Sequence, residues 1–331
     1  MKKYFCVAGT RPNIIKIDPT FPQVICFTGQ HHEKLMKDVF LKGIKIPKPD
    51  YELDETSLGG MINGIMSKMI LENPDYAIVI GDCRSSVAGA IAAQQLNIPI
   101  IHFEAGCRSG NFKMIEERNR ILIDKMAMIH FCPSQQCVVN LFNEGISQYV
   151  FNVGAIQFSN LKKMLPTRNT IKESYYLLTL HRAENVDCKE TLQSIFKGLK
   201  MSGEKIILPI HPRLRDRLKG FDLKVPENVH IIEPLSYKSF IHLLGFAKKV
   251  ITDSGGVQPE AYWMRTPCIT LRNETEWQET VNEGWNKLVG TDPVKIADAI
   301  KNWTCLKTHH SSEAYGRGEA HKYIRNLLLQ L

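Results

Sequence analysis

Acidic side chains that could act together in proton transfer occur at three places in the first half of the chain. Asp82 and Glu104 each follow a strand-like apolar run, and Glu116 opens a helix-like stretch that also contains Arg120. When such carboxylates converge in one cleft, like-charge crowding raises the pKa of one of them and leaves another ionised. The cleft then holds a general acid and a general base near neutral pH. Each residue alone has a simpler interpretation, as a helix cap, a first-turn charge or a salt bridge.

The segment from Asp253 to Glu260 has the composition of a phosphate-binding turn between a strand and a helix. The adjacent Gly255 and Gly256 let the backbone approach a ligand closely, and free N–H groups at a helix start attract a phosphate or diphosphate. Ser254 precedes the glycines, and Glu260 lies one turn into the helix, where it could bind a ribose or sugar hydroxyl. The alternative interpretation is a tight turn with a helix N-cap.

Cationic side chains at other predicted strand ends suit the same kind of ligand. They are Arg11 and Lys16 after the first strand, His181 and Arg182 after a strand in the second half, and His211 after the next strand. As imidazolium, His181 can neutralise or protonate a leaving phosphate, and Arg182 adds a fixed positive charge. A lone histidine at a strand end is usually structural, so only the combination favours binding.

The elements that must position these residues alternate along the whole chain. Short apolar runs, typical of buried strands, are separated by amphipathic segments of helical length. This alternation predicts an α/β fold with two doubly wound, Rossmann-like parallel sheets, in which ligands bind beyond the carboxyl ends of the strands. The predicted strands are Tyr4–Ala8, Val24–Phe27, Tyr76–Ile80, Ile98–Phe103, Ile129–Cys132, Tyr149–Val153, Tyr175–Leu180, Lys205–Ile210, Val229–Ile232, Val250–Thr252, Cys268–Leu271 and Lys287–Val289.

Two domains are expected because a chain of 331 residues exceeds what one hydrophobic core usually serves. A polar segment with a proline, 157–173, is the predicted hinge. Residues 1–156 would then form an N-terminal domain with the acidic groups, and 157–305 a C-terminal domain with the phosphate-binding turn. Residues 306–331 would end in one terminal helix, from Glu313 to Leu331, that packs back toward the N-terminal domain.

Composition narrows the possible classes of protein. A hydrophobic content of 44% with 23% charged residues is typical of a soluble globular protein, and no apolar run approaches the roughly 20 residues of a membrane span. The nine cysteines form no C-x-x-C pair and are expected as reduced core residues. The net charge of +8 permits an acidic partner, but the basic residues are scattered without a nucleic-acid motif, and a small polyanionic substrate fits this charge as well as any other partner. We therefore expect a cytoplasmic protein without a nucleic-acid or membrane partner.

Many ordered motifs in the chain together resemble the non-hydrolysing UDP-N-acetylglucosamine 2-epimerases. The resemblance covers nearly the whole chain and implies the two-domain fold of the B-type glycosyltransferases, with a cleft between the domains. It also implies inversion at C2 of a UDP-linked 2-acetamido sugar. The motifs are Gly9-Thr10-Arg11-Pro12, Thr28-Gly29-Gln30-His31, Gly81-Asp82, Glu104-Ala105-Gly106 with Arg108, Glu116-Glu117 with Asn119-Arg120, His181-Arg182 with Glu184-Asn185, His211-Pro212, Asp253-Ser254-Gly255-Gly256 with Gln258 and Glu260, and Val289-Gly290-Thr291.

The same resemblance assigns roles to the candidate residues. A base would remove the C2 proton as the C1–O bond to UDP breaks, and re-addition of UDP to the enclosed glycal would give the epimer, without a nicotinamide, metal or other cofactor. Asp82, Glu104 and Glu116 would be the acid and base candidates, and His181 would assist the diphosphate. The substrate-binding candidates are Arg11, Lys16, Arg120, Arg182, His211, Phe240, Ser254, Gly255, Gly256 and Glu260, although periodicity alone would place Phe240 in the core. A homodimer is expected from the relatives.

Departures from the family pattern leave more than one activity open. Asn13 stands where a glutamate is common, and Trp277 replaces an arginine, as in archaeal members and in epimerases acting on UDP-2,3-diacetamido-glucuronate. The sugar could therefore be that one. The motifs are also compatible with a hydrolysing epimerase that releases UDP and N-acetylmannosamine, with a retaining glycosyltransferase, and with an inactive nucleotide-sugar binding protein. Glu33 and the arginine-free segment Leu58–Ile65 give no reason to expect allosteric activation by substrate.

Overall fold

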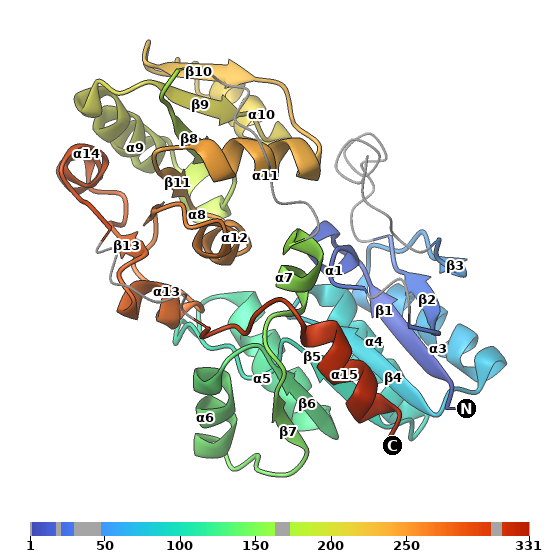
Figure 1. Cartoon of the computed structure of the whole chain (residues 1–331). Coiled ribbons are helices and arrows are strands. Elements are labelled where there is room, and N and C mark those ends of the chain that lie inside the picture. The colour runs from blue at the N-terminus through green and yellow to red at the C-terminus, as the bar shows by residue number, and fades with distance from the viewer. Residues whose placement is uncertain (1, 18–20, 30–47, 163–172, 306–312, 331) are drawn as a thin grey trace. The chain divides into compact units, whose positions relative to one another are not determined.

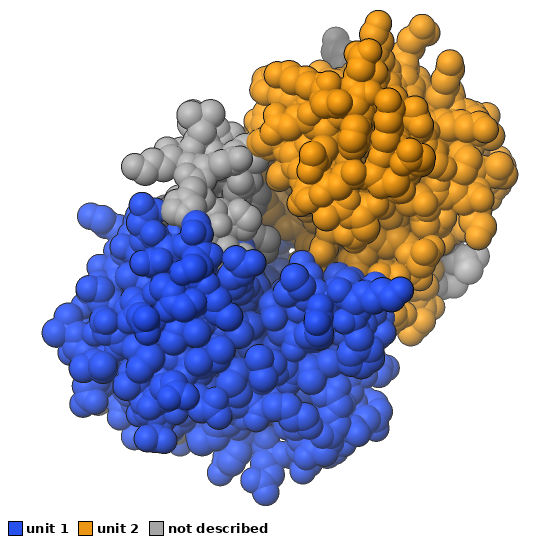
Figure 2. Space-filling model, turned by 180° about the vertical axis from the view of Figure 1, so that it is seen from behind, with its two compact units in different colours: residues 1–163, 312–331 blue, residues 164–311 orange. Residues whose placement is uncertain are grey.

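The computed structural model describes residues 2–17, 21–29, 48–162, 173–305 and 313–330. The chain divides into two compact units (Figure 2), residues 1–163 with 312–331 as unit 1 and residues 164–311 as unit 2. Each unit contains one parallel sheet with helical crossovers (Figure 1), so the predicted pair of doubly wound α/β sheets is confirmed. None of the helices in the described part of the chain has the length and apolarity that a bilayer span requires.

The sheet of unit 1 has the strand order β3-β2-β1-β4-β5-β6-β7. Side chains of β1 alternate between its two faces, because successive residues of a strand point in opposite directions. Phe5 and Val7 pack into a core with residues of α3 and α4, whereas Tyr4, Cys6 and Ala8 pack on the other face with α15. The strands are β1 (Tyr4–Ala8), β2 (Val24–Phe27), β3 (Tyr51–Glu52), β4 (Tyr76–Ile80), β5 (Ile100–Phe103), β6 (Ile129–Cys132) and β7 (Val150–Asn152). The helices are α1 (Arg11–Ile14), α3 (Leu58–Glu72), α4 (Arg84–Gln95), α5 (Ile115–Met126), α6 (Gln135–Asn143), α7 (Ile156–Leu161) and α15 (Ala320–Leu328).

The C-terminal helix α15 belongs to unit 1, where Figure 1 shows it, in red, across one face of the sheet. Ile324 and Leu328 enter the core there, and the Tyr4 hydroxyl donates to the main-chain oxygen of Leu328 at 2.7 Å. The prediction of one helix from Glu313 was wrong, because α15 begins only at Ala320. The preceding residues include Gly316 and Gly318 with φ of 75° and 76°, a left-handed backbone that ends helical continuity.

The boundary between the units lies between residues 163 and 164, not between 156 and 157 as expected. The reason is that α7 packs on unit 1: Asn160 Nδ2 donates to the main-chain oxygen of Ile15 at 2.6 Å, and Gln157 Nε2 donates to Glu104 Oε1 at 3.0 Å. Most of the predicted hinge, residues 163–172, lies outside the described residues.

Unit 2 has the strand order β10-β9-β8-β11-β12-β13. Its helices α9 and α14 lie close together because Gly198 has no side chain: a Cβ there would come within 2.8 Å of Ile296 Cβ. The strands are β8 (Tyr176–Thr179), β9 (Ile206–Pro209), β10 (Val229–Ile232), β11 (Val250–Thr252), β12 (Cys268–Thr270) and β13 (Asn286–Leu288). The helices are α8 (Ala183–Val186), α9 (Lys189–Ser202), α10 (Pro212–Gly220), α11 (Tyr237–Phe246), α12 (Val257–Trp263), α13 (Gln278–Asn282) and α14 (Pro293–Lys301).

Every predicted strand is present, with ends that differ from the prediction by two residues or fewer. The short strand β3 was not predicted. Its two residues pair with Cys26 and Phe27 of β2, and so few residues carry no recognisable alternation.

Candidate active site

The acidic residues of unit 1 follow two strands that are neighbours in the sheet. Asp82 comes after β4 and Glu104 directly after β5, and these strands pair in parallel. The loops are also joined, because Gly81 N–H donates to the main-chain oxygen of Phe103 at 2.9 Å. Parallel pairing thus brings both carboxyl-bearing loops to one edge of the sheet, as the sequence predicted.

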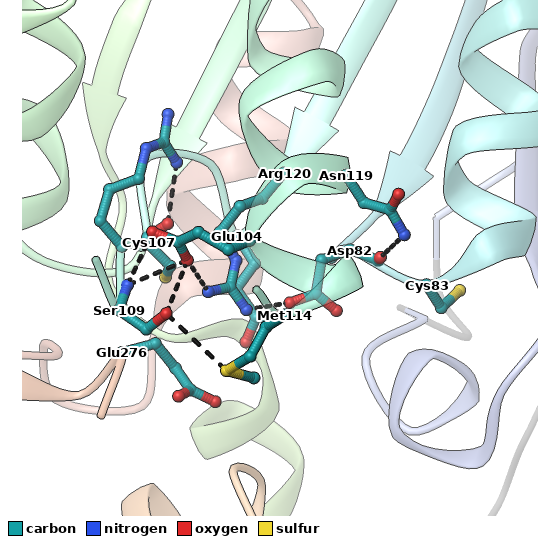
Figure 3. Close-up of polar contacts among 12 residues, drawn as sticks. Asp82, Cys83, Glu104, Cys107, Ser109, Met114, Asn119, Arg120 and Glu276 are labelled. Atoms are coloured by element: carbon teal, nitrogen blue, oxygen red, sulfur yellow. Dashed lines mark hydrogen bonds and ion pairs between the residues drawn. The ribbon is translucent and has the colours of Figure 1, made fainter. Parts of the chain in front are cut away.

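Two residues of α5 hold Asp82 (Figure 3). Arg120 Nη2 forms a close ion pair with Asp82 Oδ2, and Asn119 Nδ2 donates to the main-chain oxygen of Asp82 at 2.8 Å. The Arg120 side chain is 4% exposed and the Asp82 side chain 31% exposed. The carboxylate of Asp82 is therefore fixed by a buried cation but still accessible.

Arg120 also serves a second carboxylate, that of Glu117, to which its Nη1 donates at 2.6 Å. Glu117 is buried and accepts from the main-chain N–H groups of Ser109 and Gly110 at 2.9–3.0 Å. Burial opposes the charged form, but these N–H groups and Arg120 outweigh it and hold the pKa of Glu117 below its usual value. The sequence interpretation gave no role to Glu117, although its spacing of three residues from Arg120 places both on one helix face. Glu116 lies on the adjoining, partly exposed side of the same turn.

Glu104 has its own cation. Lys16 Nζ forms a close ion pair with Glu104 Oε2, and the side chains are 9% and 12% exposed. Burial disfavours the charged form of Lys16, yet the carboxylates of Glu104 and Asp82 outweigh it and raise the pKa of the ammonium group. Lys16, expected to contact UDP, is thus a partner of Glu104 within unit 1. Arg11 lies in α1, and its side chain is outside the described part of the chain.

The replacement at position 13 has a clear structural reason. The buried Asn13 donates from Nδ2 to the main-chain oxygen of Ile80 at 2.6 Å and accepts at Oδ1 from Cys83 Sγ at 3.2 Å. An amide provides both a donor and an acceptor, whereas an ionised glutamate only accepts. Asn13 therefore links α1 to the end of β4, beside the loop of Asp82.

The equivalent edge of unit 2 carries the histidine and glycine motifs. Strands β8 and β11 pair in parallel, so the His181-Arg182 loop and the Ser254–Gly256 turn are neighbours. Asp253 connects them: its fully buried carboxylate accepts from the main-chain N–H groups of His181 at 3.1 Å and of Arg182 at 2.9 Å. Sequence reasoning gave Asp253 no role of its own, because its partners lie some 70 residues earlier, as the separation of 72 for His181 shows.

His181 lies between a carboxylate and two guanidinium groups. Its Nδ1 is 3.5 Å from Asp253 Oδ1, and its ring stacks on that of His211 with centroids 5.2 Å apart. Partial burial lowers the pKa of His181, and Arg182 and Arg213 add to this, against the opposing effect of Asp253. His211 also caps α10, where its Nδ1 accepts from Arg213 N–H at 3.2 Å.

The two adjacent glycines differ in what surrounds them. A Cβ on Gly255 would overlap Glu276 Oε1 and lie 3.4 Å from Arg182 Nη2, whereas a Cβ on Gly256 would meet no atom within 4 Å. Glu276 cannot move freely because its buried carboxylate pairs with Arg272 at 3.1 Å. Of these two positions, internal packing therefore requires glycine only at 255, and position 256 has open space in front of it.

The remaining candidates of unit 2 are Phe240 on α11, Glu260 on α12 and Ser254 in the loop between β11 and α12. Ser254 N–H donates to Thr252 Oγ1 at 2.9 Å, and α12 begins only at Val257. The buried Glu260 accepts from the Tyr237 hydroxyl at 2.8 Å, and burial together with Glu260 raises the pKa of Tyr237. Phe240 is only partly buried and is absent from the main core cluster of the unit, contrary to what its periodicity indicated.

Among the residues that the structure describes, no group of three or more histidine, cysteine or acidic side chains is arranged so that it could hold a metal ion.

Known proteins similar to this chain carry related names. Residues 13–329 match the family model described as UDP-N-acetylglucosamine 2-epimerase. A UDP-N-acetylglucosamine 2-epimerase homolog from Methanococcus maripaludis is 40% identical, over 99% of this chain and 100% of the relative. A UDP-2,3-diacetamido-2,3-dideoxy-D-glucuronate 2-epimerase from Pseudomonas aeruginosa is 36% identical, also over 99% of this chain and 100% of the relative. The crystal structure of Methanocaldococcus jannaschii UDP-GlcNAc 2-epimerase in complex with UDP-GlcNAc and UDP has a TM-score of 0.90 at 35% identity, covering 99% of this chain and 100% of that chain.

Proposed function

The chain belongs to the UDP-N-acetylglucosamine 2-epimerase family, and we propose on this basis that it interconverts UDP-N-acetylglucosamine and UDP-N-acetylmannosamine. The observation that carries the proposal is the pair Asp82 and Glu104, at the ends of adjacent strands, each held by a cation of the same unit. Two carboxylates in different surroundings suit a reaction that removes a proton and returns one.

The reaction would proceed by elimination and re-addition. A carboxylate accepts the C2 proton, the C1–C2 double bond forms, and the C1–O bond breaks so that UDP leaves with the electron pair. The 2-acetamidoglucal then receives a proton at C2 from the opposite face, and UDP returns to C1. Because UDP leaves and returns with no net oxidation, the proposal requires neither a nicotinamide nor a metal.

Asp82, Glu104 and Glu116 are the proposed acids and bases of unit 1. The Glu104 oxygens accept from Lys16 and from Gln157 Nε2 at 3.0 Å, and we propose that Glu104 acts as the base. The Asp82 carboxylate is more exposed and pairs with the buried Arg120. Different surroundings of this kind let two carboxylates take different roles in one reaction.

Unit 2 is the proposed holder of UDP. Its contributors are His181, Arg182, His211, Phe240, Ser254, Gly255, Gly256 and Glu260, and Arg11, Lys16 and Arg120 of unit 1 complete the proposed substrate contacts. An arriving diphosphate would favour the imidazolium form of His181, whose pKa is lowered in the structure as described. His181 could then release a proton to UDP as it departs and take it back on re-addition.

The sugar itself is the second part of the proposal. Trp277 is buried at 4% exposure in the loop before α13, where the resemblance places an arginine in many members. The relative that acts on UDP-2,3-diacetamido-2,3-dideoxy-D-glucuronate by its name is 36% identical, so this substrate is the alternative candidate. Parallel assays with both UDP-sugars, compared by kcat/KM, identify the preferred substrate.

Incubation of the purified protein with UDP-N-acetylglucosamine in deuterium oxide, followed by NMR, tests the reaction. We expect deuterium at C2 and UDP-N-acetylmannosamine as the product. Free N-acetylmannosamine with UDP would instead indicate a hydrolysing epimerase, and no exchange at C2 with either UDP-sugar would contradict epimerisation. A Glu233→Gln variant, changed at an exposed residue 80% accessible at its side chain, is a control that should behave as the unaltered protein.

We further propose a homodimer, as the resemblance implies, and a location in the cytoplasm, as expected from the composition. Light scattering coupled to size-exclusion chromatography should give twice the chain mass of 37.7 kDa. Fractionation of the producing cells should recover the protein with the cytosol, and recovery with membranes would contradict the location.

A further inference from the structure

His102 lies fully buried between the two acidic loops of unit 1, and neither the family comparison nor the sequence gives it a role. It belongs to β5, and its side chain is 0% exposed. Ring atom Nδ1 is 2.6 Å from Asp124 Oδ1 on α5, and Nε2 is 3.0 Å from the main-chain oxygen of Gly81. Both ring nitrogens are therefore in hydrogen bonds that join three different elements.

Both partners of His102 are hydrogen-bond acceptors. The Gly81 oxygen can only accept, and the Asp124 carboxylate is kept ionised: burial opposes its charge, but His102 and Arg108 outweigh burial and lower the pKa of Asp124. Each ring nitrogen of His102 therefore faces an acceptor, and a ring nitrogen donates to an acceptor only where it carries the proton.

The charged groups around His102 alternate in sign. Asp124 Oδ2 also accepts from Arg108 Nη2 at 2.7 Å, and Arg108 pairs with Glu144 at 2.7 Å, so cations and carboxylates alternate. His130 approaches from β6 and contacts the main-chain oxygen of Asp124 at 2.9 Å, but burial lowers the pKa of His130, which keeps that ring neutral. Buried ion pairs persist only when such compensation and hydrogen bonding are complete.

The location of the pair connects it with the acidic residues. Gly81 immediately precedes Asp82, and His102 stands two residues before Glu104. The second oxygen of Asp124 accepts from Gly106 N–H at 3.2 Å, two residues after Glu104. His102 and Asp124 thus connect α5 to the residue before Asp82 and to the chain on both sides of Glu104.

The backbone conformation of these loops shows why they need additional contacts to hold them in place. Glu104 has a φ of 70°, a left-handed conformation that non-glycine residues rarely adopt, and Gly81 and Gly106 have φ of 64° and 77°. A residue in such a conformation keeps it only when the surrounding contacts over-determine it.

We propose that doubly protonated His102, paired with Asp124, is a positioning residue that fixes the loop of Asp82 relative to Glu104 during C2 epimerisation. The proposal rests on the proposed function for its kinetic consequence. Its structural part, the doubly protonated ring, stands independently of the reaction.

Two amide substitutions separate the two hydrogen bonds. The amide nitrogen of asparagine lies near the position of Nδ1, so His102→Asn keeps a donor to Asp124 and loses the one to Gly81. Glutamine reaches the position of Nε2, so His102→Gln keeps the donor to Gly81 and loses the one to Asp124. We expect kcat to fall on the order of tenfold to a hundredfold in His102→Asn, and less in His102→Gln, because the loop of Asp82 is held through Gly81.

Three readouts distinguish positioning from a general loss of structure. KM for the UDP-sugar and the dissociation constant of UDP should change less than about twofold, since proximity effects of this kind act on the reacting groups. His102→Gln should lose more thermal stability than His102→Asn, because it leaves the buried Asp124 without its histidine partner. His230→Asn, at an exposed histidine of β10, is the matched control and should change neither activity nor stability.

Nitrogen NMR of the unaltered protein labelled at histidine supplies a test that needs no variant. At the pH of the activity assay, one ring should show two protected N–H groups, and this signal should disappear in both variants. A single N–H on His102, or a folded His102→Asn variant with unaltered kcat, would overturn the inference. If the protein shows no C2 exchange at all, the proposed function fails, and the NMR result still decides whether the buried imidazolium exists.

Discussion

Different kinds of contact hold the loops at the carboxyl ends of the strands in the two sheets. In unit 1, side-chain ion pairs hold the functional loops: Lys16 with Glu104, Arg120 with Asp82. In unit 2, buried neutral groups contribute: Gln258 Nε2 donates to the main-chain oxygen of Ser254 at 3.3 Å, and its Oε1 accepts from Thr275 Oγ1 at 2.6 Å.

The difference fits the two proposed tasks. Proton transfer depends on the charge of each carboxylate, and a neighbouring cation is the most direct way to control it. Binding of a diphosphate depends on main-chain N–H groups and cationic side chains that point toward the ligand, so other groups must shape the loop. Unit 2 has charged exceptions as well: both oxygens of Asp253 are engaged by the His181-Arg182 loop, and the buried Glu276 beside Gly255 pairs with Arg272.

The largest effect is expected on kcat, when the carboxylates of unit 1 are changed. The same variant tests whether catalysis depends on unit 1 while UDP binding depends on unit 2. Removing the charge of both carboxylates in an Asp82→Asn, Glu104→Gln double variant should lower kcat by about 10³ to 10⁴ or more, since acid–base groups typically contribute 10² to 10⁴ each. The dissociation constant of UDP, measured by calorimetry, should stay within a few-fold. Full turnover by the double variant would remove the proposed mechanism.

Asp253→Ala should have the next largest effect, on stability as well as on binding. The change leaves the N–H groups of His181 and Arg182 without their buried acceptor, and each such group costs about 1 to 3 kcal/mol. We expect the free energy of unfolding of unit 2 to fall by about 2 to 5 kcal/mol and UDP binding to weaken. Urea unfolding curves measure the first and calorimetry the second. An Asp253→Ala variant with unaltered stability would show that these hydrogen bonds do not hold the loop.

Gly255 and Gly256 of unit 2 provide a matched comparison in which a smaller effect is expected. Gly255→Ala forces the new methyl group against the buried Glu276 carboxylate and should cost about 1 to 3 kcal/mol of stability. Gly256→Ala meets no neighbouring atom, and its φ of −74° suits alanine, so stability should be retained or slightly increased. If UDP approaches position 256, as proposed, this second variant should still bind UDP more weakly. Equal stability of the two variants in thermal melts would contradict the packing described here.

The smallest effect concerns the pH dependence of unit 1. The pKa of Glu117 is lowered on folding, so its contribution to stability is present above the ordinary value of about 4.3 and is lost as pH falls toward the folded value. The difference in melting temperature between the unaltered protein and Glu117→Gln should therefore be several degrees at pH 7 and should shrink between about pH 5 and pH 3. A difference that is constant over this range would mean that the ionised carboxylate is not what stabilises unit 1.

Much of the fold could be predicted because its signals are local. The apolar runs at Tyr4–Ala8 and Val250–Thr252 form the strands that were expected, since burial of both faces requires an uninterrupted apolar segment. The positions of Asp82 and Glu104 at one edge followed from the same pattern, because parallel strands must all end on the same side. The start of the terminal helix was harder to predict, because two glycines before Ala320 interrupt the helix that the spacing of apolar residues indicated.

The partners of the functional residues were not predictable in this way. Lys16 meets Glu104 across 88 residues, and Asp253 meets His181 across 72. The His102–Asp124 pair spans 22 residues and two elements. No periodicity in the chain marks such contacts.

The sequence by itself determined which elements form and which polar residues stand at their ends, because helix and strand periods depend on neighbours only a few residues away. The tertiary structure alone decided which carboxylate received which cation, and that Glu117, Asp253 and His102 hold the loops in place. Hydrogen bonds and ion pairs form between atoms within about 3 Å, and only the packed sheets bring residues so distant in sequence to that separation.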